Sequence, residues 1–444
     1  MPVCRPAALK RTGLVIQGLT VSNEPIRVGN LQAIHATLIV CVRLTHRTDM
    51  PLLQDPLAIL AVLMVNILVA DRLTRWPVFR QLGTSLTVIL LTAIVANLGL
   101  IPASTNAPPL YDGIFTYLAP ISIFYLLLTV NLRSLRRAGR PMVLNFFIGA
   151  AGTLLGVLAG MWAVGGPTGF GKLYYALGGM FAGTYTGGSS NLNAIALHYG
   201  VNKAGNLYAA AIATDNIVTA LWMGVTLLLP TLLNKYFPRR RPDDWTPAER
   251  DRAEAEANAH ISDVETVNPS DLALLIGLGV LSLWVSRQVA VWLPALPNIL
   301  TLTTLALLLA QWRPVQRLRG VRVLGMFCIY LFLAVIGAYC DLAALLHDGR
   351  LALTMLEFVG VLVAVHSLVQ FGVGALLRQD WAVISIASQA NLGGSASCLA
   401  ISKSLNRPDL HLPGILAGAL GNAIGTYCGL LVAEYLRGAA WLVG

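Results

Sequence analysis

The sequence predicts an all-α polytopic membrane protein built from two inverted repeats. Of its 444 residues, 56% are hydrophobic and 12% are charged, whereas soluble domains are usually about a quarter charged. Several apolar runs reach the roughly 17–25 residues that cross a bilayer as a helix. A Gly-Gly-Ser motif also occurs once in each half of the chain. Each repeat is therefore expected to hold about five transmembrane helices and one re-entrant hairpin or broken helix.

The charge and cysteine content argue against other classes of protein. The net charge is +10, but the basic residues stand in short clusters between apolar runs, which is typical of cytoplasmic loops rather than of a nucleic-acid surface. The six cysteines form no CxxC motif, so buried free thiols are expected rather than disulfides or a metal site. The sequence holds no Ser-His-Asp, Walker or HExxH pattern. We therefore expect neither an enzyme nor a resident cofactor.

The chain divides into an N-terminal extension, a first repeat, a linker and a second repeat. Residues 1–49 are basic and contain no clean span, so we expect either disorder or a start codon assigned too early, with Met50 as the alternative start. Residues 50–233 form the first predicted repeat. Residues 234–269 form a polar cytoplasmic linker, and residues 270–444 form the second repeat.

Each repeat has five predicted spans and a Gly-rich stretch before the last of them. In the first repeat the spans are 56–70, 82–101, 113–132, 141–164 and 207–233, with the Gly-rich stretch at 173–199. In the second repeat they are 272–285, 297–311, 323–338, 351–377 and 413–436, with the Gly-rich stretch at 382–404.

Clusters of arginine predict the orientation. They lie at 72–80, 133–140, 239–241 and 313–322, and the positive-inside rule places all four in the cytoplasm. If each Gly-rich stretch is a hairpin that enters and leaves on one side, each half has five spans, the halves are inverted and every cluster is inside. If both stretches cross fully, the halves are parallel and the cluster at 313–322 faces outside. We favour the hairpin arrangement, although the residues of these stretches allow either.

The repeated motif indicates an internal duplication. Gly187-Gly188-Ser189 recurs as Gly393-Gly394-Ser395, and Asn216 recurs as Asn422, each at an offset of 206 residues. A constant offset is the signature of a repeat. We therefore expect the two motifs to occupy equivalent places in the fold, at tips that meet near the middle of the membrane.

Glycine and small polar residues suit a helix break at membrane depth. Freed backbone groups are tolerated there only inside protein or a watered cavity, and helix N-termini at the break attract anions such as carboxylates. Close helix packing through small residues is the alternative explanation. The candidate substrate-binding residues are Gly187, Gly188, Ser189, Ser190, Asn191, Gly393, Gly394, Ser395 and Ser397.

Asp215 is the candidate for a coupling-ion site. It stands about nine residues inside an apolar span, where a carboxylate usually marks an ion or proton path. We expect Asp215, with Asn216 and Asn422, to bind sodium or a proton, so sodium at Asp215 is the one metal considered. A structural aspartate held by a neighbouring helix is the alternative. Glu357 and His366 are expected to make structural hydrogen bonds.

The chain resembles an uncharacterised family of membrane proteins, domain of unknown function 819. The resembling segments are TYTGGSSNLNAIA, ATDNIVTALW, ASQANLGGSASCLAIS and ALGNAIGTYCG, and the likeness runs from about Asp55 to the C-terminus. The resemblance implies a relation to secondary carriers with inverted repeats. In that group, sodium-coupled citrate and glutamate symporters carry GGxG tips and cation–proton antiporters carry Asp-Asp or Asn-Asp pairs. Here the tips read GGSS and GGSA, and the pair reads Asp215-Asn216.

These observations lead to an expected function. The chain is interpreted as a secondary active transporter, coupled to sodium or protons, that carries a small solute, most simply an organic anion. A cation–proton antiporter and a non-transporting membrane scaffold or sensor are the alternatives. The expected partners are a small-molecule substrate and the lipid bilayer, with no nucleic acid. A homodimer is also considered, formed through the part of the transporter against which the hairpin-bearing bundle moves. The expected location is the bacterial inner membrane.

Overall fold

The computed structural model describes residues 51–239, 251–252, 255, 267–294, 296–342 and 349–439. Across these residues the chain forms helices joined by loops, with no strand. The predicted extension at 1–49 lies outside the described residues, as do Met50 and most of the predicted linker at 234–269. The protein is an all-α polytopic membrane protein.

The first half is a succession of apolar helices, several of which have a proline in the first turn. The Asp55 side chain accepts the backbone N–H of Leu57 at 2.9 Å and so caps α2, which satisfies a helix-end donor that has no partner within the helix. The helices are α2 (Pro56–Leu73), α3 (Pro77–Asn97), α4 (Pro109–Gly113), a π-helical turn (Ile114–Leu118), α5 (Ala119–Leu128), α6 (Arg140–Ala163), α7 (Gly166–Phe170), α8 (Tyr174–Gly187), α9 (Ser189–Tyr199) and α10 (Gly205–Tyr236).

The second half follows the same order. Asn268 caps α12 by accepting the backbone N–H of Asp271 at 2.7 Å. The helices are α12 (Pro269–Trp292), α13 (Asn298–Ala310), α14 (Arg313–Gln316), α15 (Val321–Ala338), α17 (Gly349–Leu376), α18 (Trp381–Leu392), α19 (Gly394–Ser404) and α20 (His411–Gly438). Shifted by 206 residues, α8, α9 and α10 fall on α18, α19 and α20.

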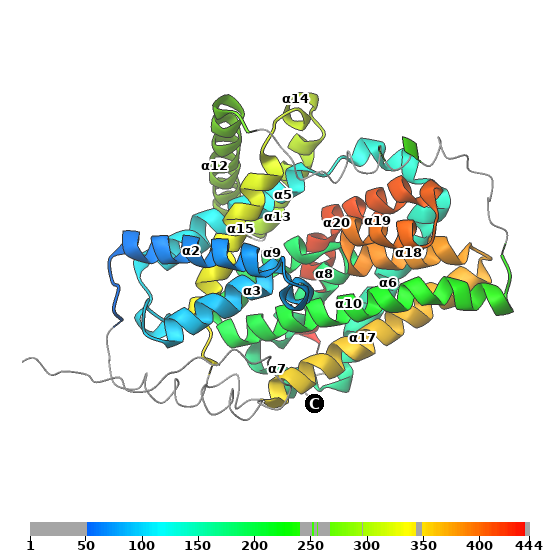
Figure 1. Ribbon diagram of the computed structural model, residues 1–444, viewed down its shortest axis with the longest axis horizontal. Helices are drawn as coiled ribbons and strands as arrows, with labels where there is room; N and C mark the ends of the chain where they lie inside the picture. The colour runs from blue at the N-terminus through cyan, green and yellow to red at the C-terminus, as the bar shows by residue number, and fades with distance from the viewer. Residues whose placement is uncertain are drawn as a thin grey trace, which may run out of the picture. The chain divides into compact units, whose positions relative to one another are not determined.

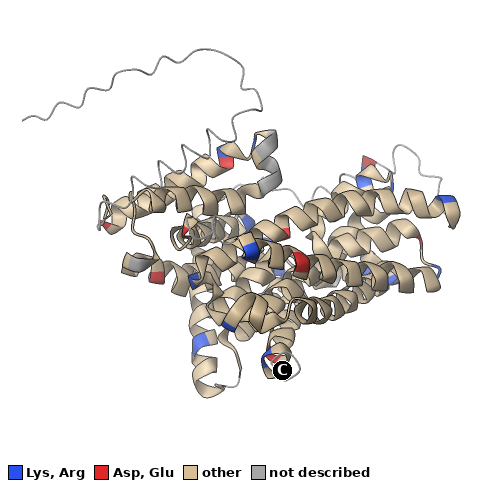
Figure 2. Cartoon of the chain, turned by 90° about the horizontal axis from the view of Figure 1, so that it is seen from below, with Lys and Arg blue, Asp and Glu red and all other residues tan. Residues whose placement is uncertain are grey.

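Every predicted span coincides with an apolar helix. Eight helices among the described residues are long and apolar enough to cross a membrane, and two shorter ones, Gly83–Asn97 and Asn298–Ala310, correspond to the second predicted span of each half. Charged residues are sparse along the helices, and the ribbon is tan over most of their length (Figure 2). The chain is therefore an integral membrane protein.

Equivalent helices of the two halves lie against each other in opposite directions. A Cβ added to Gly149 of α6 would lie 2.6 Å from Gln370 Oε1 of α17, one on Gly156 would lie 2.5 Å from the Leu362 carbonyl oxygen, and one on Gly160 would lie 2.7 Å from that of Phe358. Residue numbers rise along α6 as they fall along α17, so the two helices are antiparallel. Gly156 and Leu362 also differ by 206 residues, so this contact joins equivalent positions.

Loops gather at two ends of the helical bundle. At one end, Gln311 Nε2 donates to the Val130 carbonyl at 3.0 Å and Gln311 Oε1 accepts the Leu132 N–H at 2.9 Å. This contact brings the ends of α5 and α13 together, next to the basic segments 133–140 and 313–322. At the other end, the Asn97 side chain donates to the Cys340 carbonyl at 2.8 Å.

Candidate functional site

The first Gly-rich stretch is a helical hairpin. α8 and α9 meet at Gly188, whose φ of +101° is a conformation that glycine adopts without strain. A Cβ on Gly183 would approach both Ile195 and Asn191, and one on Gly179 would also approach Ile195. Residues before the break therefore face residues at similar distances after it, so α8 and α9 run antiparallel.

The second Gly-rich stretch has the same form. α18 and α19 meet at Gly393 and Gly394, and Gly394 has φ +72°. Across this hairpin the Cys398 thiol donates to the Ile386 carbonyl at 3.4 Å. Every residue of α18 is buried, so this half-helix passes through the interior of the protein.

Both hairpin tips contact the same part of α20. A Cβ on Gly187 would lie 1.9 Å from the backbone carbonyl of Gly421, and a Cβ on Gly418 would lie 2.5 Å from the backbone nitrogen of Ser395. Gly418 and Gly421 are three residues apart on one helix, a separation of about 4.5 Å along its axis. The tips therefore lie near each other, beside α20 in the centre of Figure 1.

The first tip joins residues from α9, α10 and α20. Ser189 Oγ donates to Asp215 Oδ2 at 3.4 Å, and Ser190 Oγ donates to Asn422 Oδ1 at 3.2 Å. Ser189 is exposed, Ser190 and Asn422 are half-buried, and Asp215 is only 5% exposed. The predicted residues therefore lie next to one another and range from an accessible serine to a buried carboxylate. Asn216 follows Asp215 and is half-buried.

Asn191 lies deeper than its neighbours at this tip. It is 1% exposed, and its Oδ1 accepts the Thr426 hydroxyl of α20 at 2.8 Å. It therefore lies between α9 and α20. Its amide nitrogen is buried and has no hydrogen-bond partner among the described residues.

The second tip differs from the first in its hydrogen bonding. Ser395 Oγ donates to the Ile415 carbonyl at 2.9 Å, and Ser397 Oγ donates to the Gly393 carbonyl at 2.8 Å. Both serines are half-buried. Because their hydroxyl protons are used by backbone carbonyls, these serines keep only oxygen lone pairs for further contacts, and the first N–H groups of α19 have no partner within their own helix.

Comparison with known proteins identifies the family. The profile of a protein family of unknown function, DUF819, matches residues 58–439. The chain belongs to the DUF819 family. It is also similar to an uncharacterized membrane protein, YjcL, of Bacillus subtilis (strain 168), with 26% identity over 360 residues. That match covers 77% of this chain and 87% of the relative.

Two residues that the sequence did not single out complete the surroundings of Asp215 in this DUF819 protein. The Tyr185 hydroxyl of α8 interacts with the Asp215 carboxylate and with the Thr219 side chain of α10. Tyr185 Oη, Thr219 Oγ1 and Asp215 Oδ1 are buried, and none has a hydrogen-bond partner among the described residues. The sequence does place Thr219 one helical turn after Asp215, on the same helix face, and this spacing could have indicated that Thr219 lies beside the carboxylate.

His366 is a structural residue, as predicted. Its Nδ1 lies 3.0 Å from the Gly149 carbonyl and its Nε2 lies 2.9 Å from Ser388 Oγ. Because a carbonyl only accepts, Nδ1 carries the proton and Nε2 accepts the Ser388 hydroxyl. Ser388 Oγ in turn accepts the Trp222 indole N–H at 3.0 Å. The imidazole is thus held between α6 and α18.

Glu357 does not match its prediction. It is exposed on α17, and no hydrogen bond of its side chain is found among the described residues. The expected structural hydrogen bond is therefore wrong within the described chain. The reason is its position on the helix: Met355 and Phe358 take the buried face, and Glu357 points away from it.

Charge is rare in the interior of this DUF819 protein. Among the described residues, Asp215 and Arg407 are the buried charged side chains. Arg407 lies at the base of the second hairpin, where it pairs with Asp380 and Asp409. The tips therefore carry one carboxylate and no buried cationic side chain from the described chain.

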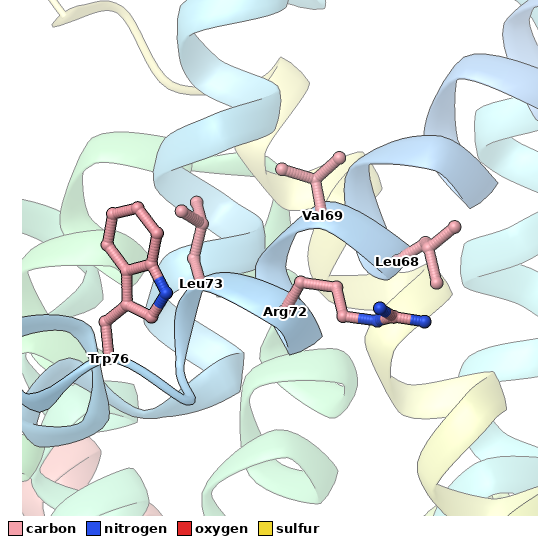
Figure 3. A pocket seen from close by; sticks show the side chains of 5 residues that line it. All are labelled: Leu68, Val69, Arg72, Leu73 and Trp76. Carbon is pink, nitrogen blue, oxygen red and sulfur yellow. The ribbon is translucent and has the colours of Figure 1, made fainter.

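A surface pocket lies elsewhere. It is formed on α2 and the turn after it by Leu68, Val69, Arg72, Leu73 and Trp76 (Figure 3). Leu68 is 57% exposed and Trp76 is 64% exposed. An open, apolar hollow at the end of a transmembrane helix suits lipid chains, and it holds no group that would bind an organic anion except Arg72.

Proposed function

We propose that this protein is a secondary active transporter that couples a cation to a small organic anion, with two inverted repeats and a site between the hairpin tips. The observation that carries the proposal is Asp215, a buried carboxylate at the break of a helical hairpin, 3.4 Å from Ser189. Ionisable residues inside a membrane protein usually mark an ion or substrate path. The inner membrane of a bacterium is the proposed location.

The packing of the helices supports inverted repeats. α6 and α17 are equivalent by the offset of 206 residues and lie antiparallel through Gly156 and Leu362. Two equivalent helices that touch in opposite directions are related by an axis perpendicular to their length, which lies in the membrane plane. Inverted repeats of this kind place their sites near the bilayer midplane.

The tips supply donors for an anion. At the start of α9 and of α19, the first backbone N–H groups have no carbonyl partner within their own helix, and the helix dipole favours negative charge there. Ser189 and Ser190 begin α9, and Ser395 lies in the first turn of α19. The proposed substrate is therefore a carboxylate or a similar small anion, held between these two helix ends.

The charge at the tips explains why a cation is needed. An anion bound near Ser189 would lie close to the Asp215 carboxylate, and two negative charges in a poorly hydrated site repel each other strongly. Either a metal cation or a proton at Asp215 removes this repulsion. Cation binding at Asp215 would thus raise the affinity for the anion, and the anion would raise the affinity for the cation by the same factor.

The test is the thermal stability of the purified protein in detergent. A ligand that binds the folded state stabilises it by mass action, by about 2.7 kcal/mol at a hundred times its Kd. Wild type and Asp215→Asn would be compared with sodium or choline chloride, with a panel of carboxylates, and over a range of pH. We expect a cation and a carboxylate to raise Tm more together than the sum of their separate effects, and Asp215→Asn to abolish this cooperation.

Other outcomes would support the alternatives. A cation–proton antiporter predicts that cations and protons compete at Asp215, with no carboxylate effect. A scaffold or sensor without transport predicts that Asp215→Asn binds and responds as wild type does. Uptake of the stabilising carboxylate into proteoliposomes, driven by a cation gradient, would then distinguish transport from binding alone.

A further inference from the structure

Three oxygen atoms meet behind the first hairpin tip without hydrogen bonds. They are Asp215 Oδ1, Tyr185 Oη and Thr219 Oγ1, each of them inaccessible to solvent. The Tyr185 hydroxyl interacts with both of the other side chains. Buried polar atoms normally have partners, so a group of unpartnered ones calls for an explanation.

The helices explain why these atoms converge. Asp215 and Thr219 are four residues apart on α10, so they lie one above the other on one helix face. Tyr185 belongs to the last turn of α8, and Ser189 begins α9 on the other side of the Gly188 break. Ser189 Oγ is 3.4 Å from Asp215 Oδ2. A serine, a threonine, a tyrosine and an aspartate from three helices therefore surround one point.

The site also lies at the negative end of a helix. α8 ends at Gly187, where the last carbonyl groups lack partners within the helix and the helix dipole is equivalent to about half a negative charge. This field favours a cation on the α8 side of the break. The same break offers amides to an anion on the α9 side, so the two proposed ligands occupy opposite sides of one hairpin tip.

We propose that Tyr185 and Thr219, together with Asp215 and Ser189, form a sodium site, an inference that rests on the proposed cation coupling. All four side chains would bind the ion through oxygen atoms, which hard cations prefer over nitrogen or sulfur. One carboxylate balances the charge of a monovalent ion. Each hydroxyl can turn an oxygen lone pair toward a bound cation by rotating its proton away from Asp215. The nearby Tyr208 hydroxyl donates to Asn193 Oδ1, and no hydrogen bond joins it to Asp215, Tyr185 or Thr219 among the described residues.

The experiment measures sodium binding to the purified full chain. Thermal shift and calorimetric titration with NaCl, at constant ionic strength set by choline chloride, would give the half-saturating sodium concentration. We expect saturable stabilisation of wild type, an increase of at least about tenfold in that concentration for Tyr185→Phe and for Thr219→Val, and no sodium response for Asp215→Asn. Both single variants lose one oxygen and keep the shape of the side chain.

Matched controls separate ligand loss from general damage. Tyr125 is a buried tyrosine of α5 whose hydroxyl donates to the Leu275 carbonyl at 3.1 Å. Thr226 lies further along α10 and donates to the Trp222 carbonyl at 2.9 Å. Tyr125→Phe and Thr226→Val should lower the Tm without sodium and leave the half-saturating sodium concentration unchanged.

The outcomes distinguish this inference from the proposed function. If sodium binds wild type and needs Asp215 but binds Tyr185→Phe and Thr219→Val as tightly, the assignment of these two ligands is wrong while cation coupling stands. If sodium has no effect and acid pH stabilises wild type but not Asp215→Asn, Asp215 holds a proton and the sodium site is excluded. If Asp215→Asn matches wild type under every condition, both proposals fail.

Discussion

Gly187 shows how a single residue fixes the distance between the first hairpin and α20. Its ideal Cβ would lie 1.9 Å from the Gly421 carbonyl group, closer than any real contact between such atoms. Gly183 and Gly179 repeat this approach one and two turns earlier, against the carbonyl oxygens of Gly425 and Gly429. Glycines four residues apart on both helices thus let two backbones touch, which is typical of close helix pairs in membranes.

We expect Gly187→Ala to separate the first hairpin from α20. The added methyl group meets backbone rather than a movable side chain, so the helices must shift, and overpacking of this kind costs about 1–3 kcal/mol or more. The Tm in detergent should fall, and binding at the adjacent tip should weaken. Gly224→Ala on α10, where a Cβ meets nothing within 4 Å, is the control and should leave the Tm equal or higher. Equal Tm values for the two variants would contradict the close approach.

A second residue-scale prediction concerns Ser388. Its oxygen accepts the Trp222 indole N–H, and its hydroxyl donates to His366 Nε2. Ser388→Ala leaves two buried polar groups without partners, and each costs about 1–3 kcal/mol. We expect a clear fall in Tm with sodium affinity unchanged. Ser404→Ala, which removes an exposed hydroxyl bonded to its own helix, should be neutral, and a neutral Ser388→Ala would show that this chain of bonds does not hold α18.

The second hairpin is anchored at its base by Arg407, which clamps two aspartates. Arg407 follows α19 and forms a fork with Asp409, with Nε–Oδ1 at 2.8 Å and Nη2–Oδ2 at 2.7 Å. Its Nη1 also donates to Asp380, the residue that caps α18 through the Ala382 N–H. Burial disfavours the charged guanidinium, but the hydrogen bonds with both aspartates outweigh it and raise the pKa of Arg407 above its usual range. The charge, and with it the clamp, therefore persists at neutral and mildly alkaline pH.

Removing this clamp should open the base of the second hairpin. Arg407→Ala leaves two poorly exposed carboxylates near each other, and breaking a buried ion pair costs about 3–5 kcal/mol. Because the aspartate side chains are 15% and 19% exposed, we expect the lower end of that range. Arg75→Ala breaks the exposed pair with Asp71 and should cost less than about 1 kcal/mol. Similar Tm values for both variants would show that Arg407 does not secure the hairpin.

At the scale of the whole molecule, the parts set by the bilayer could be predicted from the sequence. The spans follow from the apolar length that a membrane requires, and the two helix breaks follow from glycine and polar residues at a constant offset. The partners of Asp215 could not be predicted in this way. Tyr185 and Thr219 are ordinary residues for a transmembrane helix, and only the approach of the Tyr185 side chain, from the last turn of α8, to α10 brings them together. The pairing of Asp380 with Arg407 likewise depends on how the hairpin closes.

The final prediction concerns the sidedness of the two halves. Gln311 bonds to Val130 and Leu132, so the basic segments that follow them lie at one end of the bundle. Introduced cysteines at exposed Arg136 and Arg317 should therefore both be cytoplasmic. In a cysteine-free background, a membrane-impermeant maleimide should label neither in intact cells and both after permeabilisation.

Two further positions make this experiment decisive. Lys172, before α8, and Arg350, at the start of α17, are exposed and belong to the opposite end in the inverted arrangement. Cysteines there should react in intact cells. If both Gly-rich stretches crossed the membrane fully, the halves would be parallel and Arg317→Cys would react from outside while Arg136→Cys did not. Labelling of Arg317→Cys in intact cells would therefore overturn the inverted repeats. It would also overturn the proposal that the two hairpins enter the membrane from opposite sides and meet at one site.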